Sequence, residues 1–177
     1  MKALFNITLI GFAVLTATLV NAQNAAKVKV PQPVEHMLRW QGKWEGKVNI
    51  QANGKAYQST YYADFRKTAD GNGLYMDEHC NIPGFADLFG ANLIGYDPYD
   101  GKIHWYSVDN LGSTHEHVGQ FSDSNHFYME HNSLQQGKAY VEKISVDFVD
   151  ANTLLLKITA TLDGNVQEIV EAKFKRK

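Results

Sequence analysis

The sequence predicts an all-β protein, a single antiparallel up-and-down barrel of about ten strands. Segments in which apolar and polar residues alternate follow one another along the chain, separated by turn signals. The connections are short, which favours a meander of neighbouring antiparallel strands, and closing that meander removes both exposed edges. With 14 Gly, 4 Pro and 12% aromatic residues, the composition is typical of strands joined by glycine turns.

The size and charge of the chain restrict its function. Its 177 residues accommodate one domain and an N-terminal segment. A formal net charge of −2 gives no general attraction to nucleic acid, so we expect no nucleic-acid partner. The sequence contains no Gly-x-Ser-x-Gly element, phosphate-binding loop or zincin motif, and we therefore expect a protein that is not an enzyme.

Residues 1–22 are interpreted as a cleaved signal peptide. Lys2 precedes an apolar run, and Val20-Asn21-Ala22 fits the small-residue pattern of a cleavage site. An uncleaved membrane anchor is the alternative, because the apolar run is nearly long enough to cross a bilayer. The polar residues that follow favour cleavage, so we expect an exported protein, periplasmic or secreted, with no membrane span after signal removal.

Residues 23–33 are expected to form a linker, and residues 34–177 the barrel domain. Val34–Trp40 predicts a brief helix after Pro33, with its apolar residues on one side. Such a short helix is not stable alone, so it must pack against the barrel, and a barrel end is the natural place.

The expected strands begin at Gly42, and each is bounded by turn residues. Asn53-Gly54 is a strong hairpin signal between the first two. Pro83–Gly90 breaks the alternation and predicts an apolar loop. The strands are expected at residues 42–52, 55–68, 74–82, from 92 to the turn at 96–101, 103–108, 115–121, 126–132, 139–149, 153–162 and 166–175.

Several motifs resemble those of a known superfamily. Leu38-x-x-x-Gly42-x-Trp44-x-Gly46 resembles the glycine–tryptophan signature on the first strand of calycins, which include the lipocalins and fatty-acid-binding proteins. Gly95-Tyr96-Asp97-Pro98, followed by Trp105, Asp109–Gly112 and the ending Glu171–Lys177, is similar to exported bacterial lipocalin-like domains of unknown function. The resemblance implies a closed barrel with an internal cavity and implies no settled activity.

The inward faces of the predicted strands are mostly apolar and aromatic, which is typical of a small-molecule site when a few polar anchors are added. Glu78 requires a hydrogen-bond donor or a proton if it is buried, and the alternative is a position at the open rim. The 83–90 loop is expected to cover the mouth as a lid, or to pack permanently as a plug. The candidate ligand-binding residues are Tyr57, Ser59, Tyr61, Glu78, Phe85, Phe89 and Tyr106.

The histidines suggest a second kind of site. His115 and His117 lie on one face of one strand, about 7 Å apart. With a carboxylate such as Glu130 they could bind a divalent metal ion, and an exposed histidine pair is the alternative. His126 and His131 differ in parity, so a regular strand sends them to opposite faces.

Cys80 is the only cysteine, so no intramolecular disulfide forms and a small buried thiol is expected. Three functions remain open on the sequence. The first is non-catalytic binding or transport of a hydrophobic small molecule in the barrel cavity. The second is metal binding through His115 and His117, and the third is an interaction module of the cell envelope whose barrel is filled by side chains.

Overall fold

The computed structural model describes residues 31–84 and 86–177. The predicted signal peptide, the first part of the predicted linker and Phe85 lie outside the described residues. Among those that are described, no helix has both the length and the hydrophobicity needed to cross a membrane.

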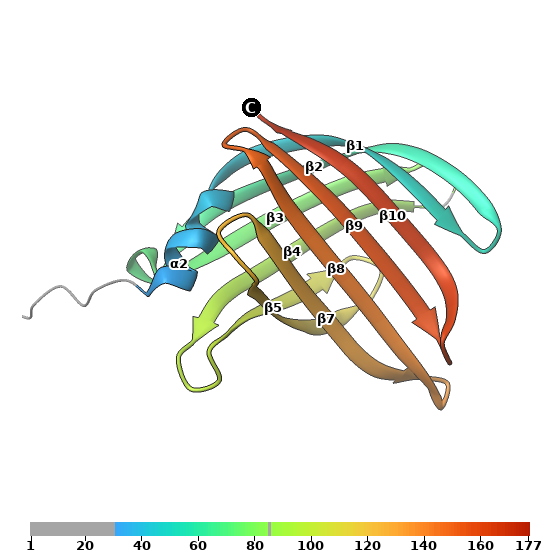
Figure 1. Cartoon of the computed structure of the whole chain (residues 1–177). Coiled ribbons are helices and arrows are strands. Elements are labelled where there is room, and N and C mark those ends of the chain that lie inside the picture. Colours follow the sequence, from blue (N-terminus) through green and yellow to red (C-terminus); the bar gives the residue numbers. More distant parts are fainter. Residues whose placement is uncertain (1–30, 85) are drawn as a thin grey trace, which may run out of the picture. The chain divides into compact units, whose positions relative to one another are not determined.

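Ten antiparallel strands form a closed barrel in which each strand pairs with the next and β1 pairs with β10 (Figure 1). This confirms the predicted fold class. The strands are β1 (Gly42–Ala52), β2 (Lys55–Thr68), β3 (Gly73–Ile82), β4 (Ala86–Asp97), β5 (Lys102–Asp109), β6 (Thr114–Phe121), β7 (His126–Gln135), β8 (Lys138–Asp150), β9 (Thr153–Leu162) and β10 (Asn165–Arg176).

The tight turns between strands use the predicted residues. Asn53 and Gly54 both have positive φ, 51° and 71°, between β1 and β2. A two-residue turn of this hand matches the right-handed twist of the strands that it joins. The register is continuous over the β1–β2 hairpin, from Ala52 paired with Lys55 to Gly42 paired with Phe65.

The prediction of a loop at residues 83–90 is wrong for most of these residues. β4 begins at Ala86, and its first residues pair with β3 from Ile82–Ala86 to Glu78–Gly90. Leu88 faces inward and Phe89 outward, as in any strand. The apolar residues on both faces hid this alternation in the sequence.

A short helical segment lies across one end of the barrel (Figure 1). It consists of α2 (Gln32–Met37), which begins within the predicted linker, and the 3₁₀ turn η1 (Leu38–Trp40). Trp40 is 1% exposed, and its ring lies 4.9 Å from that of Phe127 and 5.6 Å from that of Trp105. Apolar packing of this kind supplies the stability that six helical residues cannot supply alone.

Trp44 links this segment to the first strand. It is 2% exposed, and its indole Nε1 donates a hydrogen bond of 2.7 Å to the Trp40 carbonyl oxygen. The Arg176 guanidinium lies 4.1 Å from the centre of the indole ring. Trp44 is therefore buried and joins the helical segment to β1.

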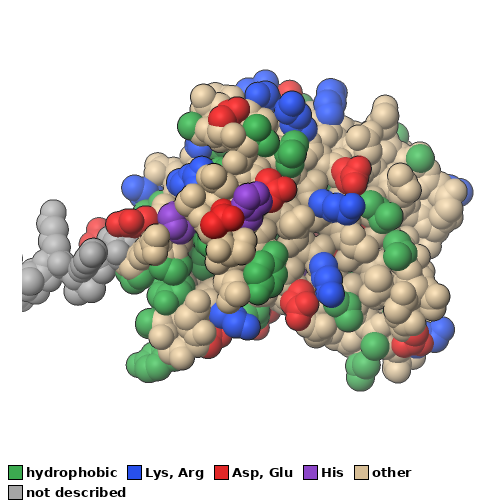
Figure 2. Space-filling view, viewed as in Figure 1, with side chains coloured by type: hydrophobic (Ala, Val, Ile, Leu, Met, Phe, Trp, Pro, Cys, Tyr) green, Lys and Arg blue, Asp and Glu red, His purple; other side chains and the backbone are tan. Residues whose placement is uncertain are grey.

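The outer surface carries charges of both signs. On the face shown in Figure 2, Lys and Arg side chains are interspersed with Asp and Glu rather than gathered by sign. On this face the charges of both signs lie too close together to create a strong field of a single sign.

Candidate functional site

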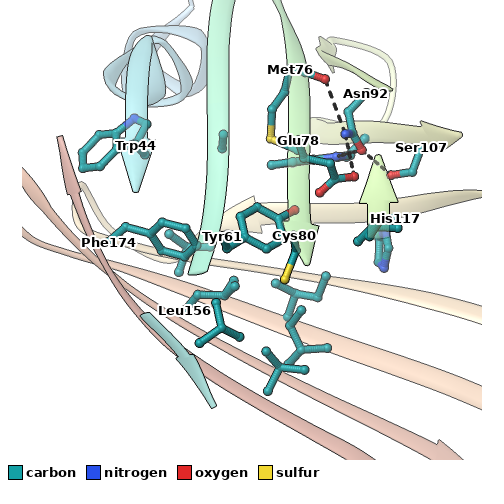
Figure 3. Close-up of a pocket in the computed structure, with 18 of the residues that line it drawn as sticks. Trp44, Tyr61, Met76, Glu78, Cys80, Asn92, Ser107, His117, Leu156 and Phe174 are labelled. Carbon is teal, nitrogen blue, oxygen red and sulfur yellow. Dashed lines mark hydrogen bonds between the residues drawn. The ribbon is translucent and has the colours of Figure 1, made fainter. Parts of the chain in front are cut away.

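The barrel encloses a cavity of about 280 Å³, lined by Trp40 and by residues of all ten strands (Figure 3). Alternation along each strand sends one set of side chains into this space and the other outward. Most of the lining is apolar, for example Val48, Ile144 and Leu156. The walls therefore favour an apolar occupant.

Polar side chains gather on one side of the cavity around Asn92, away from Trp44 and Phe174 (Figure 3). Asn92 is 3% exposed, and its Oδ1 accepts hydrogen bonds from Trp105 Nε1 at 2.8 Å and from Ser107 Oγ at 2.6 Å. Its Nδ2 donates to Glu78 Oε1 at 3.0 Å. Nδ2 also donates to the Met76 carbonyl oxygen at 3.5 Å, so the buried amide is fully used and fixes the positions of its four partners.

Glu78 is the inward carboxylate of β3, and its environment favours the neutral form. Burial raises the pKa of the Glu78 carboxyl above its ordinary value, and the hydrogen bond from Asn92 only partly opposes this effect. The nearby acids Asp109 and Glu142 raise the pKa further. The sequence predicted that a buried Glu78 needs a donor or a proton, and the structure supplies Asn92 as the donor.

Three histidines meet beside this network. His115 and His117 come from β6 with ring centres 4.8 Å apart, and the ring of His131 on β7 lies 5.1 Å and 5.7 Å from theirs. His117 Nε2 lies 3.3 Å from Glu142 Oε1, and the Tyr140 hydroxyl donates to Glu142 Oε2 at 3.0 Å. Adjacent strands thus bring together residues that are distant in sequence.

Burial and hydrogen bonding shift the pKa values of two groups in this cluster. Burial lowers the pKa of the His115 imidazole, and the charge of His117 acts in the same direction. Burial also opposes ionisation of Glu142, but hydrogen bonds from His117 and Tyr140 together hold the pKa of its carboxyl below the ordinary value. The shifts favour the neutral form of His115 and the ionised form of Glu142.

Two predicted binding residues, Tyr61 and Glu78, line the cavity. Tyr57 and Ser59 pair with the inward residues Ile50 and Val48 and so share the inner face, but they are not part of the cavity wall. Ser59 Oγ instead accepts a hydrogen bond of 3.4 Å from the thiol of Cys80, which is buried as expected.

The other predicted binding residues lie elsewhere. Tyr106 is 51% exposed on the outer face of β5, because Trp105 and Ser107 take the inward positions on either side of it. Phe89 is 53% exposed and stacks on the His79 ring at 4.4 Å, so it is not part of a lid. Phe85 lies outside the described residues.

Glu130, the expected carboxylate partner of the histidines, faces outward and accepts a hydrogen bond from Asn132. Glu142 takes its place, since β8 directs it inward with Ile144 and Val146. That parity was visible in the sequence and places Glu142 on the inner face, although it does not by itself identify Glu142 as the partner of the histidines. Asn92, Ser107, Asp109 and Glu168 also line the cavity and were not predicted.

No protein-family model and no curated protein matches the chain. Among solved structures, Rv2717c from M. tuberculosis is similar, with a TM-score of 0.62 and 13% identity over 84% of this chain and 99% of that one. The S-type phycobiliprotein lyase CPES from Guillardia theta has a TM-score of 0.58 and 11% identity, covering 85% of this chain and 96% of its own. At these identities the likeness shows the fold alone, and that fold is a calycin-like barrel.

Proposed function

We propose that the protein binds a small apolar molecule in the barrel cavity without transforming it. The observation that carries this proposal is the cavity of about 280 Å³, with its apolar walls and its polar groups on one side. A barrel filled by side chains, the interaction-module alternative, would leave no such space. The histidine cluster supports the alternative of metal binding through His115 and His117.

The volume limits the size of the ligand. An apolar cavity of about 150 Å³ accepts benzene, so this cavity encloses on the order of twelve non-hydrogen atoms. Long fatty acids do not fit within it, whereas a compact aromatic or alicyclic molecule does.

The charge of the lining selects the head group of the ligand. Among the described residues of the wall there is no Lys or Arg, and the four acids Glu78, Asp109, Glu142 and Glu168 are present. A ligand carboxylate would be buried beside four acids with no Lys or Arg as its partner, which is costly. A neutral or amine head group can instead donate to these oxygens.

Fluorescence titration with 1-aminonaphthalene and 1-naphthoic acid tests both features, because the two probes share a ring system and differ in head group. We expect saturable binding of the amine with a dissociation constant in the micromolar range, about −8 kcal/mol. The acid should bind at least about tenfold more weakly, a difference of roughly 1.4 kcal/mol. Equal or tighter binding of the acid contradicts the proposed selectivity, and binding of neither probe contradicts the proposed function.

A further inference from the structure

We propose that His115, His117 and Glu142 form a binding site for one divalent transition-metal ion, with zinc as the best fit. This inference goes beyond small-molecule binding and does not depend on it. Two imidazoles and a carboxylate are a known donor set for zinc with one coordination position left open. All three residues line the cavity, so that position faces the space inside the barrel.

The geometry of the three side chains is close to that of a metal site. Each residue offers one ligand atom, and these atoms all lie within 4.8 Å of one another. A tetrahedral zinc ion at about 2.0–2.1 Å from its ligands holds them about 3.3 Å apart. Side-chain rotations that move the ligand atoms by about 1 Å therefore complete the site without movement of the strands.

His117 provides an independent observation. It is 3% exposed, and its Nδ1 is a buried nitrogen for which the described residues supply no hydrogen-bond partner. Leaving a buried polar atom without a partner is costly, and such atoms call for an explanation such as an ion. Nε2 of the same ring lies 3.3 Å from Glu142 Oε1, so an ion that takes Nδ1 as its ligand would satisfy the ring nitrogen that lacks a partner.

Neighbouring groups hold the ligands in place, as they do in metal sites. Ser113 Oγ lies 3.0 Å from His115 Nδ1, which leaves Nε2 of that ring for a metal ion. The Tyr140 hydroxyl holds one oxygen of Glu142 at 3.0 Å. His131 Nδ1 donates to the Glu116 carbonyl oxygen at 2.8 Å, which orients this ring beside the cluster.

A surface hollow lies beside His131, at the edge of the cluster. The backbone pairing of β6 with β7 runs from Phe121–Phe127 to Val118–Glu130, and His131 lies just beyond it. A hollow of about 450 Å³ on these strands is lined by His131 together with Glu116 and Glu130. Lys102 lines the hollow as well, so its two acids exceed its Lys and Arg residues by one charge and favour the approach of a cation only weakly.

His104 forms a contrasting cluster with Asp97 and Asp100 at a surface turn. Both of its ring nitrogens are occupied, with Nε2 3.0 Å from Asp100 Oδ2 and Nδ1 2.5 Å from Glu116 Oε1. No orphaned nitrogen points to an ion here among the described residues. His104 is therefore the matched control for His117.

The test is a titration of chelator-treated protein with Zn²⁺ by calorimetry, repeated with Co²⁺ while the visible absorption spectrum is recorded. No small molecule is added, so a failure here is distinct from a failure of the proposed function. We expect one ion per chain and a four-coordinate Co²⁺ spectrum. His117→Phe and Glu142→Gln should each weaken Zn²⁺ binding at least about tenfold, whereas His104→Phe should change it less than about twofold.

Thermal melting of each metal-free variant establishes that it is folded. If His117→Phe does not fold, the Zn²⁺ affinity of Glu142→Gln tests the proposal. The absence of saturable Zn²⁺ binding overturns the proposal. An equal loss of affinity in His104→Phe also overturns it, because the ion would then bind at the surface turn.

Discussion

Replacing Trp44 tests how the barrel end is closed. Its side chain is 2% exposed, so Trp44→Ala leaves a large cavity and should lower the free energy of unfolding by about 3–5 kcal/mol. For a domain of this size, each kcal/mol corresponds to roughly 2–4 °C, which gives a fall in melting temperature of about 6–20 °C. Urea denaturation followed by circular dichroism measures the free energy, and a thermal scan measures the midpoint.

A second variant separates packing from hydrogen bonding at the same position. Trp44→Phe keeps most of the ring and removes the 2.7 Å hydrogen bond to the Trp40 carbonyl, so about 1–2 kcal/mol should be lost. Tyr99 is 98% exposed, and Tyr99→Ala should change stability by less than about 0.5 kcal/mol. If Trp44→Ala is as stable as Tyr99→Ala, Trp44 does not pack as described and the account of the closed end is wrong.

Three further predictions concern acid stability, packing and export. Because the folded-state pKa of Glu78 is raised above its ordinary 4.5, the native state binds this proton more tightly than the unfolded chain. Stability should therefore fall as pH rises from about 4.5 through the raised pKa, and Glu78→Gln should remove that part of the slope in urea melts at several pH values. A Cβ on Gly119 would lie 2.2 Å from the Tyr128 carbonyl oxygen, so Gly119→Ala should destabilise the protein by about 1–3 kcal/mol, whereas an unchanged denaturation midpoint would show that β6 and β7 can separate there. We also propose cleavage after Ala22 during export, and the intact mass of protein recovered from the envelope or medium should lack residues 1–22; a mass that includes them refutes cleavage.

The strands and their faces could largely be predicted from the sequence, because alternation and turn chemistry are local properties. In the sequence of β1, Trp44, Val48 and Ile50 share one parity and polar or charged residues lie between them, and all three are buried. Local patterns failed where both faces of a strand carry apolar residues, as at Leu88 and Phe89.

The polar site was less predictable, because its contacts depend on register between strands. His117 meets Glu142 only because β7 lies between β6 and β8 and pairs His131 with Glu142. No pattern along a single strand specifies such a meeting. Tyr106 shows the related difficulty that, in an aromatic strand, either parity offers a plausible inward face.

Blocking the cavity tests the central claim most directly. Leu156 lines the cavity and its neighbour Leu155 is 40% exposed on the outer face, so a tryptophan at one position fills the space while the same residue at the other does not. By fluorescence titration with 1-aminonaphthalene, we predict that Leu156→Trp weakens binding at least about tenfold and that Leu155→Trp leaves it unchanged within about twofold. Equal affinities for both folded variants would place the probe outside the barrel and contradict the claim that the cavity is the binding site.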